Sequence, residues 1–241
     1  MSNAACFRFF GHLRGLLLRP YREDTAIYRF KENPGINDPI ETMGIPHTEV
    51  DVILAAGASV GFDYQLRDQD QIEVYPVFSQ VPAKPLLHLT PPVTLSPTFI
   101  LDVHLGKLAR RLRILGFDCL YRNDYADAEI IRIARAEQRI ILTRDRGLLK
   151  QRKVERGYLV NSDHVAVQLD MTMQRYQLND KVKLFCRCSS CNGLTGPVEK
   201  TSIQHRLLPK TILYYERFHR CQDCARIYWQ GPHYQRLLSW M

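Results

Sequence analysis

Hydrophobic and polar positions follow two different patterns along the chain. Up to about residue 78, short apolar or alternating stretches bounded by turn residues predict strands at residues 7–10, 26–30, 50–54 and 71–75. Residues 36–43, entered through Asn33-Pro34-Gly35, predict a helix. The predicted order is strand, strand, helix, strand, strand, which is a small mixed α/β domain.

A proline-rich stretch follows this first segment. Five prolines lie between residues 79 and 98, namely Pro82, Pro85, Pro91, Pro92 and Pro97. Proline donates no backbone hydrogen bond and favours extended chain, so the stretch is expected to be a linker or strap.

From residue 98 the period lengthens, and strands alternate with helices. Strands are predicted at residues 99–101, 119–121, 139–143 and 158–160. Helices are predicted at 104–115, 127–137 and 164–176, with a short one around 148–149, and Gly116 ends the first. This alternation indicates a parallel sheet covered by helices on both faces.

Carboxylates stand where the predicted parallel strands end. Asp102, Asp145 and Asp163 each follow a strand, and Asp127 opens a helix near the same edge. Ligands bind beyond the carboxyl ends of such strands, and converging carboxylates repel one another unless a cation neutralises them. Hard oxygen ligands suit Mg²⁺ or Mn²⁺, so we expect Asp102 and Asp145 to hold a metal that activates water.

Each aspartate also has a purely structural explanation. Asp127 can serve as the N-cap of its helix, and Asp163 can cap the last helix in the same way. A purely structural role is less expected for Asp102 and Asp145, because each follows an apolar strand directly.

The charge of the chain favours a polyanionic partner. The formal net charge is +8, and residues 181–241 carry 10 basic side chains against 3 acidic ones. Cations that neutralise phosphates gain from counterion release. Candidate RNA contacts are Arg144 and four cations of helix 104–115, namely Lys107, Arg110, Arg111 and Arg113. The alternative for that helix is an ordinary solvated basic face.

Two cysteine pairs near the C-terminus have the spacing of a zinc site. Cys188-x-x-Cys191 and Cys221-x-x-Cys224 predict a tetrahedral four-thiolate site, in which zinc has no open position and is structural. A redox role for the pairs is the alternative, but neither pair sits at a strand-to-helix junction. Cys186 lies two residues before Cys188 and is expected to be a spare thiol.

Aromatic side chains alternate with cations around these cysteines, and aromatic rings can stack unpaired bases. Trp229 and His233 are the candidate RNA contacts there. The alternatives are that Trp229 fills a thin core and that His233 is structural.

Targeting signals are not apparent in the sequence. It has no run of 18 apolar residues and no secretory signal pattern at its start. We therefore expect a cytoplasmic protein without a membrane partner.

The first segment resembles the ubiquitin-like β-grasp domains related to sulfur-carrier proteins. Residues 66–77, LRDQDQIEVYPV, are similar to their closing pattern, with Gln69 where glycine is usual. Sulfur carriers act through a free C-terminal Gly-Gly, whereas this chain continues through residues 78–80. The resemblance therefore implies a docking or substrate-binding role.

Residues 98–241 resemble the Mut-seven C-terminal RNase family, a branch of the PIN-like nucleases with a fused zinc ribbon. The similar phrases are residues 99–118, residues 141–145, the cysteine pairs and residues 228–233. The resemblance implies ribonuclease activity through Asp102, Asp127, Asp145 and Asp163. Members of the family also occur with an N-terminal ubiquitin-like domain, so the resemblance covers nearly the whole chain.

These observations together predict four segments and one function. The segments are a β-grasp domain at 1–80, a linker at 81–97, a PIN-like α/β domain at 98–180 and a zinc ribbon at 181–241. The expected function is metal-dependent hydrolysis of RNA, with a ribosome or another RNA–protein complex as a further partner. A non-catalytic RNA- or ribosome-binding protein and a DNA nuclease are the alternatives.

Overall fold

The computed structural model describes residues 2–77, 79–92, 94–184 and 186–231. The chain divides into two compact units, one of residues 1–93 with 131–159 and the other of residues 94–130 with 160–241. Helix α4 (Asp127–Ala136) runs across the boundary between these ranges. In the part of the chain described, no helix is both long and apolar enough to span a membrane.

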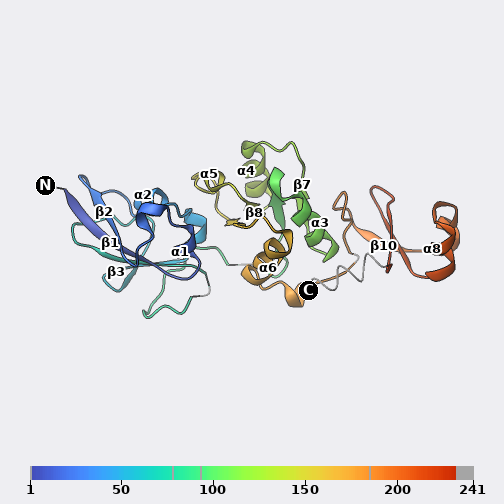
Figure 1. The fold of residues 1–241 in the computed structure, drawn as a ribbon, viewed down its shortest axis with the longest axis horizontal. Coiled ribbons are helices and arrows are strands. Elements are labelled where there is room, and N and C mark those ends of the chain that lie inside the picture. The colour runs from blue at the N-terminus through green and yellow to red at the C-terminus, as the bar shows by residue number, and fades with distance from the viewer. Residues whose placement is uncertain (1, 78, 93, 185, 232–241) are drawn as a thin grey trace. The chain divides into compact units, whose positions relative to one another are not determined.

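The first unit begins with a five-stranded sheet of order β2-β1-β5-β3-β4. Its strands are β1 (Asn3–Phe9), β2 (Ala26–Phe30), β3 (Val52–Ala55), β4 (Ala58–Val60) and β5 (Gln71–Tyr75). Between them lie α1 (Leu13–Leu16), η1 (Arg19–Tyr21), α2 (Asn37–Thr42) and η2 (His47–Glu49). Strands β1 and β5 are parallel and the other pairs antiparallel, which with α2 makes a β-grasp fold (Figure 1).

The four predicted strands and the predicted helix of this domain are confirmed, and its core follows the apolar pattern. In β1 the buried Ala5, Phe7 and Phe9 alternate with polar or half-buried positions, as the period of a strand requires. Ile36, Ile40 and Met43, at helical spacing around α2, are fully buried. The pattern did not reveal α1 or the short strand β4.

Gln69 explains why glycine is usual at its position. Its φ is +65°, in the left-handed region that side chains with a Cβ disfavour. The turn is held because Gln69 N–H donates to Ala4 O at 2.7 Å and the Asp70 carboxylate accepts from Arg67 N–H at 2.8 Å. Strand β5 is therefore placed beside β1 in spite of the strained residue.

The proline-rich stretch is a strap over much of its length. Three of its apolar side chains, Val81, Ala83 and Leu86, pack against a buried cluster of Val52, Leu54 and Tyr75. The buried Asp51 accepts hydrogen bonds from His88 Nδ1 at 2.8 Å and from Thr90 N–H at 3.2 Å. Residues 81–90 therefore belong structurally to the β-grasp domain.

The rest of the first unit is a parallel strand–helix–strand segment. Strands β8 (Ile140–Thr143) and β9 (Gly157–Leu159) are fully buried and pair in parallel, with Thr143 opposite Leu159. Helix α5 (Arg146–Leu149) connects them. Element η2 contacts β9, and the fully buried Glu49 accepts a hydrogen bond from Leu159 N–H at 2.6 Å.

The second unit contains a matching segment. Strands β6 (Phe99–Leu101) and β7 (Cys119–Tyr121) pair in parallel, and η3 (Val103–Leu105) and α3 (Gly106–Ile114) connect them. Leu108, Ala109 and Leu112 on α3 are fully buried, and α3 packs on α6 (Val165–Arg175). The predicted parallel α/β arrangement is confirmed within each unit.

The C-terminal part is a small antiparallel module. Its sheet has the order β10-β11-β12, with β10 (Thr195–Val198), β11 (Phe218–Cys221) and β12 (Ile227–Trp229). The short helical elements are η4 (Asn179–Lys181), α7 (Lys200–Ile203), η5 (Gln204–Arg206) and α8 (Pro209–Tyr214). At Gly116, with φ +97°, a Cβ would lie 2.2 Å from Lys183 O, so the chain entering this module leaves no room for a side chain.

Candidate functional site

Asp102 is the first residue after the buried strand β6. Only 4% of its surface is exposed, and its Oδ1 accepts a hydrogen bond from His104 N–H at 2.8 Å. This bond makes Asp102 the N-cap of η3 and fixes the side chain relative to the end of the strand.

Asp145 repeats this arrangement after strand β8. Its Oδ1 accepts from Gly147 N–H at 2.7 Å, which makes Asp145 the N-cap of α5. A Cβ at Gly147 would lie 3.1 Å from that oxygen, so glycine allows the close approach. Asp145 N–H in turn donates to Thr143 Oγ1 at 2.8 Å. Unlike Asp102, Asp145 is exposed.

The sequence suggested N-cap positions for Asp127 and Asp163. In the structure Asp102 and Asp145 occupy N-cap positions. Asp127 is the first residue of α4, and the carbonyl of Ala126 already accepts from Ile130 N–H at 3.0 Å, so Asp127 lies inside the first turn. The N-cap of α6 is His164, which places Asp163 one residue before the cap. Both carboxylates are exposed, whereas Asp102 and Asp145 occupy the N-cap positions of η3 and α5.

Two of the predicted cations on α3 are available to a ligand and one is not. Lys107 and Arg110 are exposed, and Arg111 is half-buried, where burial lowers its pKa. Arg113 is 4% exposed, and its guanidinium donates to Cys119 O at 2.8 Å and to Ser190 O at 2.8 Å. Arg113 therefore connects α3 and β7 to the cysteine-containing loop, and its buried guanidinium does not fit the RNA contact predicted for it.

The remaining predicted RNA contacts have mixed positions. Arg144 is exposed beside Asp145. Trp229 is half-buried, with its ring centroid 6.3 Å from that of Phe218 and 6.5 Å from that of Tyr215. Part of the Trp229 side chain therefore packs in the core of the module, which agrees with the alternative that this residue is structural. His233 lies outside the described residues.

The four predicted cysteines come together. The sulfur atoms of Cys188, Cys191, Cys221 and Cys224 all lie within 4.8 Å of one another. Two sulfur–sulfur distances, 3.5 Å for Cys188–Cys224 and 3.4 Å for Cys191–Cys221, are close to the roughly 3.8 Å that tetrahedral bonds of about 2.3 Å to zinc would give. The cluster is therefore capable of binding zinc.

The two Cys-x-x-Cys turns are built alike. In each, the N–H of the second cysteine donates to the first sulfur at 3.5 Å, at Cys188 and at Cys221. The residue after the second cysteine has a positive φ in both turns, +70° at Asn192 and +54° at Ala225. This repeated backbone directs both sulfur atoms of each turn to one side.

The cysteine thiols do not ionise equally without a cation. Burial raises the pKa of Cys188, but hydrogen bonds from Cys191 N–H and the Tyr228 hydroxyl outweigh it and lower that pKa to about 6. Burial and the neighbouring thiols raise the pKa of Cys191 to about 12. A divalent cation that binds all four thiolates would remove this conflict, which fits zinc.

Some residues of this region gave no signal in the sequence. Asn192 donates from Nδ2 to Asp118 Oδ1 at 2.8 Å and accepts from Cys119 N–H at 3.0 Å, so a residue of the cysteine turn anchors the start of β7. The Tyr228 hydroxyl lies 3.0 Å from Cys188 Sγ and accepts from Ser189 N–H at 3.1 Å. Such contacts join distant positions, which periodicity alone does not indicate.

The fold and the cysteine cluster define an α/β protein with an N-terminal β-grasp domain and a C-terminal module that resembles a zinc ribbon. A family model described as the Mut7-C RNAse domain matches residues 97–241, and another described as Mut7-C ubiquitin matches residues 2–82. The chain belongs to the Mut7-C RNAse domain family, and the family resemblance inferred from its motifs is confirmed. No curated protein and no solved structure matches the chain.

Proposed function

We propose that this protein is a metal-dependent ribonuclease whose acidic residues are Asp102, Asp127, Asp145 and Asp163. Membership of the Mut7-C RNAse domain family supports a nuclease role. The observation that carries the proposal is the repeated geometry of Asp102 and Asp145. Each follows a buried parallel strand, and each side chain is fixed by the N–H two residues later.

The donor set fits a hard divalent cation. Carboxylate oxygens are the ligands that Mg²⁺ and Mn²⁺ prefer. Bound Mg²⁺ or Mn²⁺ would supply an activated water and stabilise charge on the phosphate. Asp102 and Asp145 would hold this cation, while Asp127 and Asp163 would bind it or orient the water.

Exposed cations near Asp102 would bind the substrate backbone. Lys107 and Arg110 are three residues apart on α3, so they lie on one face of that helix. Arg144, directly before Asp145, is the third candidate. These side chains would hold phosphates beside the cleaved bond, where they also compensate its developing charge.

Zinc bound to the four cysteines would act as a structural ion. The site would be closed, with four protein ligands and no position for water. A ribbon of about 60 residues has a thin core and benefits from such a cross-link. We propose that the protein acts in the cytoplasm and that its partner is RNA. The zinc ribbon and the β-grasp domain would aid RNA or partner binding.

The test is incubation of the purified chain with labelled single-stranded RNA and the matching DNA, in Mn²⁺ or in EDTA. The proposal predicts RNA cleavage in Mn²⁺, none in EDTA, and slow or no cleavage of DNA. RNA that is bound but stays intact in Mn²⁺ would favour the non-catalytic alternative. Equal cutting of DNA would favour the DNA nuclease.

A further inference from the structure

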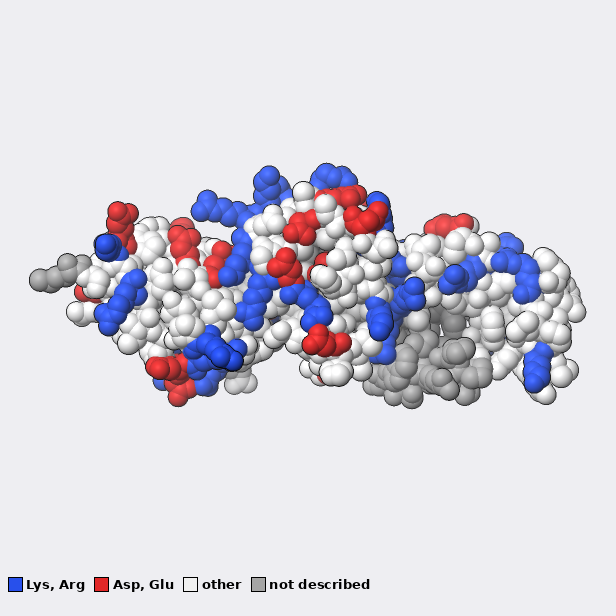
Figure 2. Space-filling view, turned by 45° about the horizontal axis from the view of Figure 1, so that its top comes forward, with Lys and Arg blue, Asp and Glu red and all other residues white. Residues whose placement is uncertain are grey.

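The stretch from Ile131 to Leu159, in the first unit, is the most basic part of the α/β segment. It carries nine Lys or Arg side chains and three Asp or Glu side chains. Figure 2 shows basic side chains in scattered groups on the face drawn, with acidic side chains among them. None of these residues except Arg144 was among the RNA contacts expected from the sequence, so this charge calls for a separate explanation.

Some of these cations have structural roles. Arg146 Nη1 donates to Leu16 O at 2.7 Å, and Lys150 Nζ donates to Glu41 O. Arg139 Nε lies 2.7 Å from Glu137 Oε2, with only 10% of its side chain exposed. These three side chains hold the fold together and are not free to bind a ligand.

Other cations remain available, and they lie on one loop and one helix. Arg152 and Lys153 are exposed and Arg156 is half-buried, all on the loop between α5 and β9. Within the described residues, none of these three side chains makes an ion pair. On α4, Arg132 is exposed, and Arg135 has only a loose pair with Glu155, at 3.5 Å between half-exposed groups. A surface ion pair of this kind contributes little.

The β-grasp domain holds this loop in place. His47 Nε2 lies 2.7 Å from Val154 O, and the Lys150 bond to Glu41 O fixes the start of the loop. Val154 itself is buried, and its N–H donates to Gln151 O at 2.8 Å. The cations therefore project from a fixed backbone, which reduces the ordering entropy that binding would cost.

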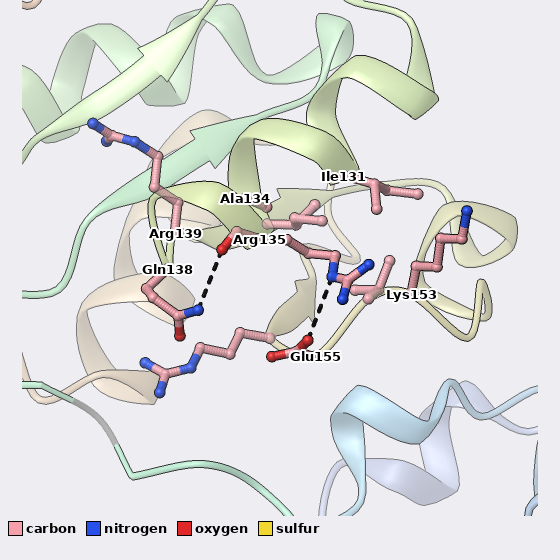
Figure 3. A pocket seen from close by; sticks show the side chains of 10 residues that line it. Ile131, Ala134, Arg135, Gln138, Arg139, Lys153 and Glu155 are labelled. Atoms are coloured by element: carbon pink, nitrogen blue, oxygen red, sulfur yellow. Dashed lines mark hydrogen bonds and ion pairs between the residues drawn. The ribbon is translucent and has the colours of Figure 1, made fainter.

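The surface between α4 and the loop is too shallow for a base. Figure 3 shows Arg135 directed toward Glu155, with Lys153 on the same rim and Gln138 bonded to Arg135 O. The hollow that these residues line has a volume of about 10 Å³, room for a single water molecule. A ligand must therefore lie over this surface and meet its charges.

We propose that Arg152, Lys153 and Arg156, with Arg132 and Arg135 beside them, form a binding surface for the phosphate backbone of single-stranded RNA. The proposal rests on the proposed ribonuclease function for its choice of RNA. The contacts are to phosphates alone, so the surface binds RNA regardless of sequence. It would hold the strand while the acidic residues cut it.

The test compares two triple variants of the full chain that remove the same charge. The loop variant is R152Q/K153Q/R156Q, and the matched control is R29Q/K31Q/R67Q, three exposed cations of the β-grasp domain. Affinity for a labelled single-stranded RNA is measured without added Mg²⁺ or Mn²⁺ and without a chelator, so that the proposed zinc stays bound, from about 50 to 200 mM salt. The slope of log K for association against log salt is negative, and in the loop variant it should be less steep by about 2, since each lost contact to a single strand removes about 0.7.

The control variant should keep a steeper slope than the loop variant, and R152K/R156K should keep the slope of the original chain because the charges remain. Equal slopes for the two triple variants, at unchanged thermal stability, would overturn the proposal. So would displacement of the RNA by polyglutamate of equal charge, which would indicate an acidic protein. If the loop variant lost its fold, R152Q alone would be measured. An unchanged salt slope for R152Q would overturn the proposal, and a slope less steep by about 0.7 would support it.

Because binding is measured without cleavage, the two proposals can fail separately. A chain that binds RNA through this loop but cuts none in Mn²⁺ supports the surface and contradicts the ribonuclease. A chain that cuts RNA while the loop variant binds it unchanged does the reverse.

Discussion

At the scale of single residues, Arg113 is a cation of α3 whose contacts serve the fold. Arg113 was grouped with the exposed cations of its helix because residue type does not reveal burial. Its partners, Cys119 O and Ser190 O, come from another strand and from a loop 77 residues away.

Arg113 should contribute stability. Arg113→Met would leave buried carbonyl groups without donors, and we expect it to lower the free energy of unfolding by about 1–3 kcal/mol. Arg110→Met, an exposed control on the same helix, should change it by less than about 0.5 kcal/mol. Urea denaturation measures both, and equal effects would refute the structural role of Arg113.

Gln69 should be a strained position that glycine relieves. Because its φ is +65°, Gln69→Gly is expected to stabilise the β-grasp domain by up to about 1 kcal/mol. Gln71→Gly, at an exposed position of β5, should instead destabilise it by about 0.5–1 kcal/mol. A loss of thermal stability in Gln69→Gly would contradict the assigned backbone conformation.

At the scale of elements, the cysteine turns make the clearest prediction. The purified chain should contain about one equivalent of zinc, and Cys191→Ser or Cys224→Ser should lose it together with thermal stability. Cys186→Ser is the matched control and should retain the zinc, since Cys186 Sγ is not part of the cluster. Less than about half an equivalent in fresh protein, measured by metal analysis, would count against the site.

The contact between η2 and the loop before β9 should depend on pH. Burial lowers the pKa of His47, but hydrogen bonds to Glu41 and to Val154 O outweigh it, so the pKa lies above its ordinary value of 6.5. Both partners are acceptors, which the doubly protonated ring satisfies. The contribution is therefore complete below pH 6.5 and declines as pH rises through the raised pKa.

We expect the free energy of unfolding to fall as pH rises above 6.5, and His47→Gln to flatten that part of the profile. His205→Gln, a variant of an exposed histidine outside this contact, is the control and should keep the original profile. Urea titrations at several pH values measure the difference. A profile for His47→Gln as steep as that of the unmodified chain would exclude this origin.

At the scale of the whole molecule, local patterns predicted strands and helices but not the contacts between distant segments. Four strands of the β-grasp domain and the parallel segments followed from period and turn residues. The strap at residues 81–90 and the bond between Glu49 and Leu159 N–H did not, because they join residues far apart in the sequence. The basic surface was also missed, since its cations are divided between a helix and a loop.

The central claim is that Asp102 and Asp145 serve one metal-dependent reaction, and the initial rate of RNA cleavage in Mn²⁺ tests it most directly. Asp102→Asn and Asp145→Asn should each slow cleavage by at least about 100-fold. Asp170→Asn, an exposed carboxylate of α6, is the matched control and should cut as the unmodified chain does. Zinc content and thermal stability should be the same in folded samples of all three. Cleavage by Asp102→Asn and Asp145→Asn as fast as that of the control would contradict the account.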